Sequence, residues 1–276
     1  VMGKAPEDPH WKRKARTAGD KPTLSMDYKS FGQTCNNEEE EGDKVTALVM
    51  RDGETTNTFS HVVEEKGKGN GWIVEKIVED IASLGYTEVI IKGDGEPALV
   101  QVMKAVRESR SQSTLIENPP AYDPQSNGAA EKAVDQVMGQ LRTLKLALES
   151  KIDLKIGTQW NILTWMVEHV GSTINRYQVG HDGKTPFRRI MGKDCNQKVL
   201  EFGEKVLIKP KRRPKTTRKH ALDGRWIYAT WVGVTARSNE HVVVLPNGGN
   251  AYRVRSVRRI PEDQRWRGAV SYTHLT

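Results

Sequence analysis

Hydrophobic and polar residues alternate over residues 24–28, which is the pattern of a half-buried β-strand. Asp27 lies in the middle of this strand, on its polar side. Two further strand-like runs follow at residues 44–51 and 55–63, and an Asp-Gly dipeptide joins them. Because this dipeptide favours the tight turn of a hairpin, the fold is predicted to begin with three strands, with Asp52 as a turn residue.

The pattern then changes to amphipathic helices that alternate with short β-branched strands. Helices are predicted at residues 72–84, 98–109, 129–150 and 160–177, and strands at residues 87–91 and 114–117. Asp80 is expected on the solvent side of the first of these helices. The order of elements predicts an α/β domain over residues 21–200, in which helices flank a mixed five-stranded sheet.

A different pattern begins after Gly203. Short strand candidates separated by turn residues occur at residues 205–208, 228–234, 241–245 and 251–255. This spacing predicts a small β-barrel-like domain over residues 203–266. Residues 1–20 are polar and are expected to be a linker or arm, and residues 267–276 are expected to be an unstructured tail of spurious origin.

The basic charge of the chain is concentrated in its C-terminal part. The 276 residues carry a formal net charge of +8. Residues 203–276 contain 16 Lys+Arg and 5 Asp+Glu, whereas residues 1–202 contain 27 and 30. A basic segment favours a polyanionic partner such as DNA, because each cation near a phosphate releases bound counterions. A solvated tail that keeps the protein soluble would have the same composition.

Other function classes are disfavoured by what the sequence lacks. It contains no apolar run of about 18 residues, so it predicts neither a membrane span nor a membrane partner, and we expect a soluble intracellular protein. Cys35 and Cys195 lie far apart and outside any CxxC pair. They are expected to be free thiols, and no zinc site is expected from this chain alone.

Three acids stand where a strand, a strand end and a helix start could meet. Asp27 is within the first predicted strand, Asp94 follows the strand at residues 87–91 with a glycine on either side, and Glu131 is in the first turn of a predicted helix. Carboxylates that converge in this way bind hard cations. Two Mg²⁺ or Mn²⁺ ions held together can activate an attacking oxygen and stabilise a leaving oxygen in phosphoryl transfer.

The sequence motifs around these acids resemble those of a known family. Asp27 follows LSM, Asp94 lies in KGDGEP and Glu131 in YDPQSNGAAEKAV, with 36 residues between the last two acids. This pattern resembles the D,D-35-E signature of retroviral and LTR-retrotransposon integrases. Residues 175–176, 185–187 and 202–204 are also similar to the downstream pattern of these cores, so the resemblance covers about residues 23–206.

The resemblance implies an RNase H-like fold and a two-metal site that uses Mg²⁺ or Mn²⁺. Asp27, Asp94 and Glu131 would be both its catalytic residues and its metal ligands. The implied activity is 3′-end processing and strand transfer of retrotransposon DNA into host DNA. The implied partners are element DNA, target DNA and further copies of the chain, and the implied location is the nucleus.

Candidate DNA contacts lie in two places. The loop at residues 122–128 is expected to touch DNA near the scissile phosphate through Gln125 and Asn127, and Lys132 follows on the helix. The second place is the basic run at residues 209–220, with the cations Lys209, Lys211, Arg212 and Arg213. This run is equally consistent with a DNA-binding strip, a nuclear-import signal and a solvated loop.

Two departures from the integrase pattern leave other functions open. Asp135 stands one turn after Glu131, where retroviral relatives commonly place Lys, and the zinc-binding HHCC module of the family is absent, so the chain is expected to be a fragment that begins after that module. A DDE transposase or an RNase H-like nuclease would use the same acids. A catalytically decayed protein that binds DNA or chromatin is the alternative outside enzymes.

Overall fold

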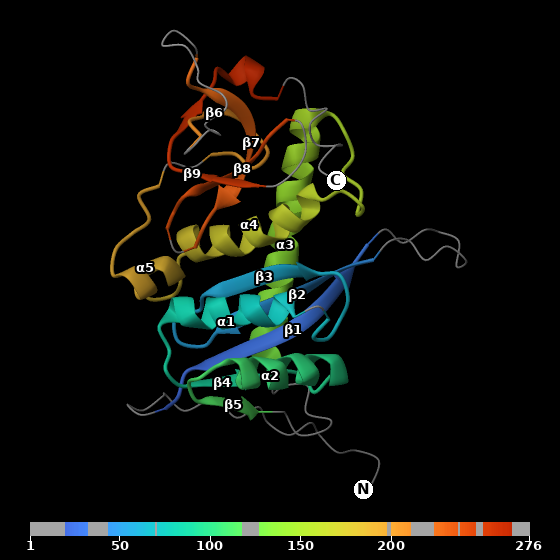
Figure 1. Cartoon of the computed structure of the whole chain (residues 1–276), viewed down its shortest axis with the longest axis vertical. Helices are drawn as coiled ribbons and strands as arrows, with labels where there is room; N and C mark the ends of the chain where they lie inside the picture. The colour runs from blue at the N-terminus through green and yellow to red at the C-terminus, as the bar shows by residue number, and fades with distance from the viewer. Residues whose placement is uncertain are drawn as a thin grey trace, which may run out of the picture.

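Two β-sheets with helices packed between and around them make up the part of the chain that the structure describes (Figure 1). The structure is a computed structural model that describes residues 20–32, 44–69, 71–117, 127–197, 200–210, 224–236, 238–246 and 251–266. Each sheet has five strands. The predicted fold class, a mixed sheet with flanking helices followed by a smaller β structure, is confirmed.

The first sheet has the strand order β3-β2-β1-β4-β5. Its strands are β1 (Thr23–Phe31), β2 (Val45–Asp52), β3 (Thr58–Val63), β4 (Val89–Lys92) and β5 (Thr114–Glu117). The first three strands form an antiparallel meander, whereas β4 is parallel to β1 and β5 is parallel to β4. The sheet is therefore mixed, as the order of elements predicted.

The turn between β2 and β3 is held by Asp52. This residue is fully buried, and its Oδ2 accepts hydrogen bonds from the backbone N–H of Thr55 at 2.7 Å and from the hydroxyl of Tyr86 at 2.8 Å. The backbone N–H of Gly53 donates to the carbonyl of Thr23 at 2.8 Å. The predicted turn role of Asp52 is therefore confirmed, and the meander follows from it.

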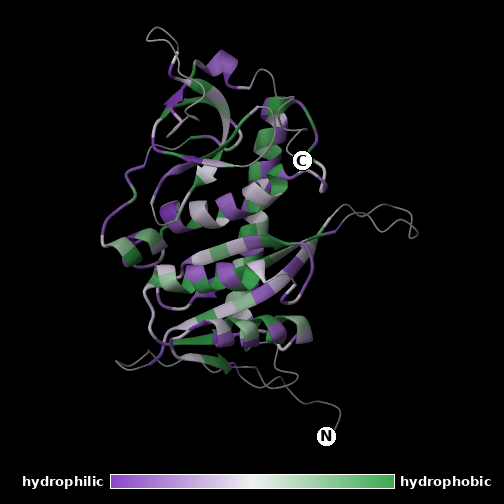
Figure 2. Cartoon of the chain, viewed as in Figure 1, coloured by the Kyte–Doolittle hydropathy of each residue, from purple (hydrophilic) through white to green (hydrophobic). Residues whose placement is uncertain are grey.

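Two helices cover one face of this sheet, α1 (Trp72–Leu84) and α2 (Pro97–Ser109). Each carries hydrophobic residues towards the sheet and hydrophilic residues elsewhere (Figure 2). The core that they form with the sheet contains these fully buried side chains: Leu24, Met26, Leu48, Met50, Ile77, Ile81, Ile91, Leu99 and Met103. Gly85 ends α1 with a φ of 79°, a left-handed conformation that glycine adopts without strain.

Asp80 does not lie on the solvent side of α1, so that prediction was wrong. Its exposed fraction is 7%, and its Oδ2 lies 2.6 Å from Nε2 of His61 on β3. Nδ1 of the same imidazole lies 3.3 Å from Oε1 of Glu168. Because the buried imidazole of His61 needs charged partners, Asp80 faces the protein interior although it is a polar residue on a helix. The helical period alone does not show this contact.

The other face of the sheet is covered by the long helix α3 (Gly128–Ile152) and by α4 (Ile162–Tyr177). Helix α3 crosses β1 and β2, and α4 follows the edge strand β3. The side-chain amide of Asn175 accepts from the backbone N–H of Thr58 and donates to its carbonyl, both at 2.7 Å. It takes the place of a neighbouring strand, so the edge of the sheet is closed by a helix.

The second sheet is antiparallel throughout and has the order β10-β6-β7-β8-β9. Its strands are β6 (Lys205–Ile208), β7 (Ile227–Val234), β8 (His241–Val244), β9 (Tyr252–Val254) and β10 (Val257–Arg259), and the short 3₁₀ helix η2 (Glu262–Gln264) follows. Its own core is formed by Leu200, Val206, Ile208, Ala229, Trp231, Val243 and Val254. Val232 and Val244 face the other way and join the core of α3 and α4.

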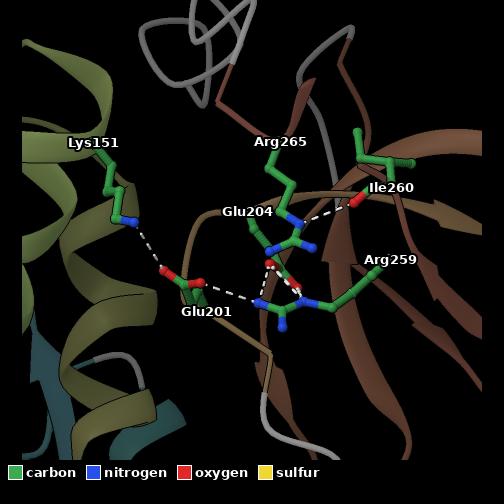
Figure 3. Close-up of polar contacts among 6 residues, drawn as sticks. All are labelled: Lys151, Glu201, Glu204, Arg259, Ile260 and Arg265. Atoms are coloured by element: carbon green, nitrogen blue, oxygen red, sulfur yellow. Dashed lines mark hydrogen bonds and ion pairs between the residues drawn. The ribbon is translucent and has the colours of Figure 1, made fainter. Parts of the chain in front are cut away.

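A chain of ion pairs also joins this sheet to α3 (Figure 3). Nζ of Lys151 lies 3.7 Å from Glu201, whose other oxygen accepts from Nη2 of Arg259 at 3.1 Å. The same guanidinium donates to the fully buried Glu204 through Nη2 at 2.7 Å and Nε at 2.9 Å. Because a planar guanidinium matches a carboxylate in this geometry, the pair fixes β10 against the start of β6.

The sequence pattern missed three short elements, and η2 is one of them. Helix α5 (Pro186–Met191) begins at Thr185, whose hydroxyl accepts from the backbone N–H of Arg188 at 3.1 Å, and β10 has three residues. Elements this short span too few residues to show a period. The division at residues 200–203 into two domains stays a prediction. Within the described ranges, every helix is too short or too polar to cross a membrane.

Candidate metal-dependent active site

Asp27 and Asp94 lie side by side because of the register of two parallel strands. In the pairing of β1 with β4, Thr23 is opposite Ile90 and Ser25 is opposite Lys92. The same offset places Asp27 at the level of Asp94, which follows β4 by two residues. Asp27 points to the face that α3 covers, since side chains alternate along a strand.

Glu131 completes the group from the first turn of α3. This helix packs across β1 and β2, and its buried residues Ala130, Ala133 and Val134 fix the helix start against that face. Glu131 itself is exposed, as is Asp94, whereas Asp27 is half-buried. The three acids thus come from a strand, a strand end and a helix start, and their grouping into one site stays a prediction.

The three acids act on one another electrostatically. Burial is the largest of the causes that raise the pKa of Asp27 to about 6, and the charges of Asp94, Glu131 and Glu96 contribute to the same shift. A hydrogen bond from the backbone of Tyr28 lowers it in part. Acids that repel one another at a half-buried position leave negative charge uncompensated, and a cation supplied from outside would relieve it.

The chemistry of these donors fits a hard divalent cation. All are carboxylate oxygens, which Mg²⁺ and Mn²⁺ prefer over nitrogen or sulfur. In the part of the chain that the structure describes, no three acids, histidines or cysteines stand close enough together to hold one ion. The three acids act on one another through their charges but do not form a closed set of ligands in this structure.

The loop that carries Asp94 is shaped by its glycines. A Cβ at Gly93 would lie 2.7 Å from Cδ2 of Leu99, so only glycine allows α2 to pack this closely. Gly95 has a φ of 86°, and the backbone N–H of Glu96 donates to Oδ1 of Asp94 at 2.9 Å. Pro97 then begins α2. This hydrogen bond holds one carboxylate oxygen of Asp94 in a defined position.

A lysine stands beside the acids, and the sequence pattern offered no reason to single it out. Nζ of Lys66, in the loop between β3 and α1, lies 2.8 and 3.0 Å from the two carboxylate oxygens of Glu96. The hydrogen bond to Glu96 and the charges of Glu96, Asp94 and Asp27 together raise the pKa of Lys66. Lys66 lies in the glycine-rich run EEKGKGNG, and that run was the only signal that could have pointed to it.

The predicted DNA contacts are placed in part. Asn127 precedes α3 and is buried, and within the described chain neither its Oδ1 nor its Nδ2 has a hydrogen-bond partner. Lys132 is exposed on the first turn of α3, and Lys209 is exposed just after β6. Gln125, Lys211, Arg212 and Arg213 lie outside the described residues. These residue assignments stay predictions.

A second surface with DNA-binding chemistry lies on the smaller sheet. The guanidinium of Arg258 lies 4.4 Å from the ring centre of Trp226, and Nζ of Lys205 lies 4.6 Å from that of Tyr228. Strand pairing sets Arg258 and Tyr228 on either side of Leu207. The ring of Tyr228 is exposed and that of Trp226 is partly buried. Cations beside such rings suit both the phosphates and the bases of nucleic acid, and the basic composition alone did not indicate the aromatic residues.

Comparison with known proteins finds likeness in structure. No protein-family model matches the chain, and no curated protein matches it. Three of the similar solved structures are the catalytic core domain of BIV integrase (15% identity, TM-score 0.41, 62% of this chain and 93% of that chain), a chain of the simian T-cell lymphotropic virus intasome (15%, 0.46, 92% and 84%) and the HTLV-2 integrase catalytic core domain in complex with magnesium (15%, 0.44, 61% and 94%). Each of the three is described as an integrase core or as an intasome. Identities of 15% and TM-scores of 0.41 to 0.46 carry no statement about the activity of this chain.

Proposed function

We propose that this chain is the catalytic part of a retrotransposon integrase, a metal-dependent polynucleotidyl transferase that processes the 3′ ends of element DNA and joins them to host DNA. The parallel register of β1 and β4 carries the proposal, because it sets Asp94 beside Asp27 where the charge of Glu131 also acts. The words around Asp94 and Glu131 support the choice of integrase over other enzymes that use the same fold.

Asp27, Asp94 and Glu131 would hold Mg²⁺ or Mn²⁺. Two such ions, when bound, activate the attacking water or 3′-hydroxyl and stabilise the leaving oxygen. The fold of the chain determines where the three acids lie. Asp27 is fixed by β1, Asp94 is oriented by the backbone N–H of Glu96, and Glu131 is fixed by the packed first turn of α3. No protein general base is needed for this chemistry.

DNA is the proposed partner, and the nucleus is the proposed place of action. Lys132 lies one residue after Glu131 on an exposed helix face, where it can pair with a phosphate close to the acids. Lys205 and Arg258 would contact a more distant part of the duplex through the smaller sheet. Further copies of the chain are proposed to hold paired DNA ends, as in an integrase multimer.

A strand-transfer assay on short duplexes in Mg²⁺ tests the proposal. Glu131→Gln removes a ligand charge while keeping the shape of the side chain, and we expect it to lower product formation by more than about 100-fold, since even the outer partners of metal ligands contribute 10- to 100-fold. Glu108→Gln is the matched control, because Glu108 is an exposed acid on α2 away from the site. It should leave the rate unchanged.

The products separate the remaining functions. Joined strands that depend on Glu131 identify strand transfer, whereas cut strands without joining identify a nuclease. DNA binding without any metal-dependent product identifies a decayed, binding-only protein. Equal product from the wild type and Glu131→Gln would exclude the proposed site.

A further inference from the structure

Lys66 and Glu96 form an ion pair close enough to Asp27 and Asp94 to interact with them electrostatically. Neither residue of the pair lies within a strand or a helix. Lys66 comes from the loop between β3 and α1, and Glu96 precedes the first residue of α2. Both carboxylate oxygens of Glu96 lie within 3.0 Å of Nζ of Lys66. The lysine and glutamate side chains are 40% and 29% exposed, so the pair is at the rim of the site and can open towards solvent.

The loop that carries Lys66 is built to approach the site. Gly67, Gly69 and Gly71 have φ values of 105°, 44° and 85°, which are left-handed conformations that favour glycine. The backbone N–H of Gly67 donates to the hydroxyl of Tyr28 at 3.3 Å, and Nζ of Lys66 lies 5.5 Å from the centre of the same ring. Tyr28 directly follows Asp27, so the loop is anchored to the strand that carries the central acid.

The charges of this pair reach the proposed metal ligands. The negative charge of Glu96 acts on Asp27, and the positive charge of Lys66 is felt by both Asp94 and Asp27. Glu96 is also attached to Asp94 by its backbone N–H. The cluster therefore consists of the three acids proposed to bind a divalent cation, together with Glu96, which is paired with Lys66.

We propose that Lys66 is a positioning residue that acts as a built-in cation of this site: paired with Glu96, it compensates part of the acidic charge and weakens the binding of the first divalent cation. This inference rests on the proposed function, since it concerns the same metal ligands. When a divalent cation binds, the ammonium of Lys66 is repelled from the acids. Lys66 thereby sets the metal concentration at which the site fills.

Binding of Mn²⁺ alone, with free Mn²⁺ measured by electron paramagnetic resonance, tests this without any catalytic readout. Lys66→Met keeps the apolar stem over Tyr28 and removes the charge, and it should tighten Mn²⁺ binding by about tenfold. Glu96→Gln should weaken it by about tenfold. In the double variant Lys66→Met with Glu96→Gln both charges are gone, so the affinity should return to within about threefold of the wild type.

Two controls exclude an effect of the loop itself. Lys66→Arg keeps the charge and should stay within about twofold of the wild type. Lys68→Met removes an exposed lysine two residues further along the same loop and should also stay within about twofold. Equal tightening by Lys66→Met and Lys68→Met would overturn the inference, because it would show a general effect of net charge.

Asp94→Asn separates this inference from the proposed function. If Asp94→Asn weakens Mn²⁺ binding while Lys66→Met changes it by less than about twofold, the metal site stands and the role of Lys66 is overturned. If Asp94→Asn binds Mn²⁺ as the wild type does, the proposed metal site itself is overturned, and the role of Lys66 with it.

Discussion

Two groups of acids, each including a residue next to the first sheet or within it, differ in how their charge is compensated. Asp80 is buried against the ring of His61, which Glu168 contacts from the other side. Asp27 is half-buried against Asp94 and Glu131, so its neighbours are acids as well. The first group therefore has a full counter-charge inside the fold, whereas the second has only Lys66 nearby, which is paired with Glu96.

The pKa values follow the same division. Burial alone lowers the pKa of His61, but the charge of Asp80 and its hydrogen bond, together with Glu168, raise it to about 9. For Asp27, burial and its acidic neighbours both disfavour the charged form. The carboxylates beside His61 therefore favour its charged form in the folded state, whereas the repulsion within the acidic group costs stability.

Removal of the counter-charge in the first group should have the largest effect on stability. Asp80→Asn takes the carboxylate from a buried imidazolium, and we expect the free energy of unfolding to fall by about 3 kcal/mol, as for other buried pairs that lose one partner. Urea denaturation at pH 7 measures this. Glu79→Gln, at an exposed position one residue earlier in α1, is the control and should change it by less than about 0.5 kcal/mol. Similar unfolding of the two variants would contradict the comparison.

The pH dependence of stability should show the same pair with an effect of similar size. The pKa of His61 is about 9 in the folded protein and 6.5 without perturbation, so the folded state binds the extra proton between these values. Its stabilisation is complete below pH 6.5 and is lost as the pH rises through 9. We expect a loss of about 1.4 kcal/mol per pH unit over this window.

Denaturation at pH 6.5, 7.5 and 8.5 measures this slope. His61→Gln should remove most of it, whereas His181→Gln, at an exposed position, should keep it. A slope that is the same in the wild type and in His61→Gln would assign the dependence to other groups.

The acidic group should respond in the opposite direction and by the smallest amount. Asp27→Asn removes a charge that its neighbours repel, so we expect the free energy of unfolding at pH 8 in the absence of divalent metal to rise by about 1 kcal/mol. The same variant should lose strand transfer. Excess Mg²⁺ should stabilise the wild type but not Asp27→Asn, because only the wild type gains a ligand that binds the folded state. Destabilisation by Asp27→Asn would place Asp27 with the structural acids.

Much of the fold could be predicted from the sequence because its hydrophobic residues recur with a clear strand or helix period. The meander through Asp52, the helices α1 to α4 and the start of the smaller sheet were predicted from alternation, helical spacing and turn residues. The place of Asp80 was not, because the helical period describes one face of a helix and His61 lies on a strand 19 residues earlier. The elements α5 and β10 were missed because three to six residues show no period.

The candidate site divides in the same way. The sequence motifs around Asp94 and Glu131 are enough to select both acids as candidates. Each motif consists of neighbouring residues, so it can be recognised without the tertiary structure. Lys66 and Glu96 could not be paired from the sequence, because 29 residues and a complete helix separate them. The contact between Trp226 and Arg258 also joins two residues that are far apart in the sequence.

The sequence by itself determined the order of strands and helices, the kinds of acid present and the words that resemble integrases, because these are properties of neighbouring residues. Tertiary structure alone decided that β4 joins β1 in the register that sets Asp94 beside Asp27, and that Lys66 reaches Glu96. The physical reason is that charge interacts through space and not along the chain. Whether an acid such as Asp27 or Asp80 is paired depends on packing between distant elements.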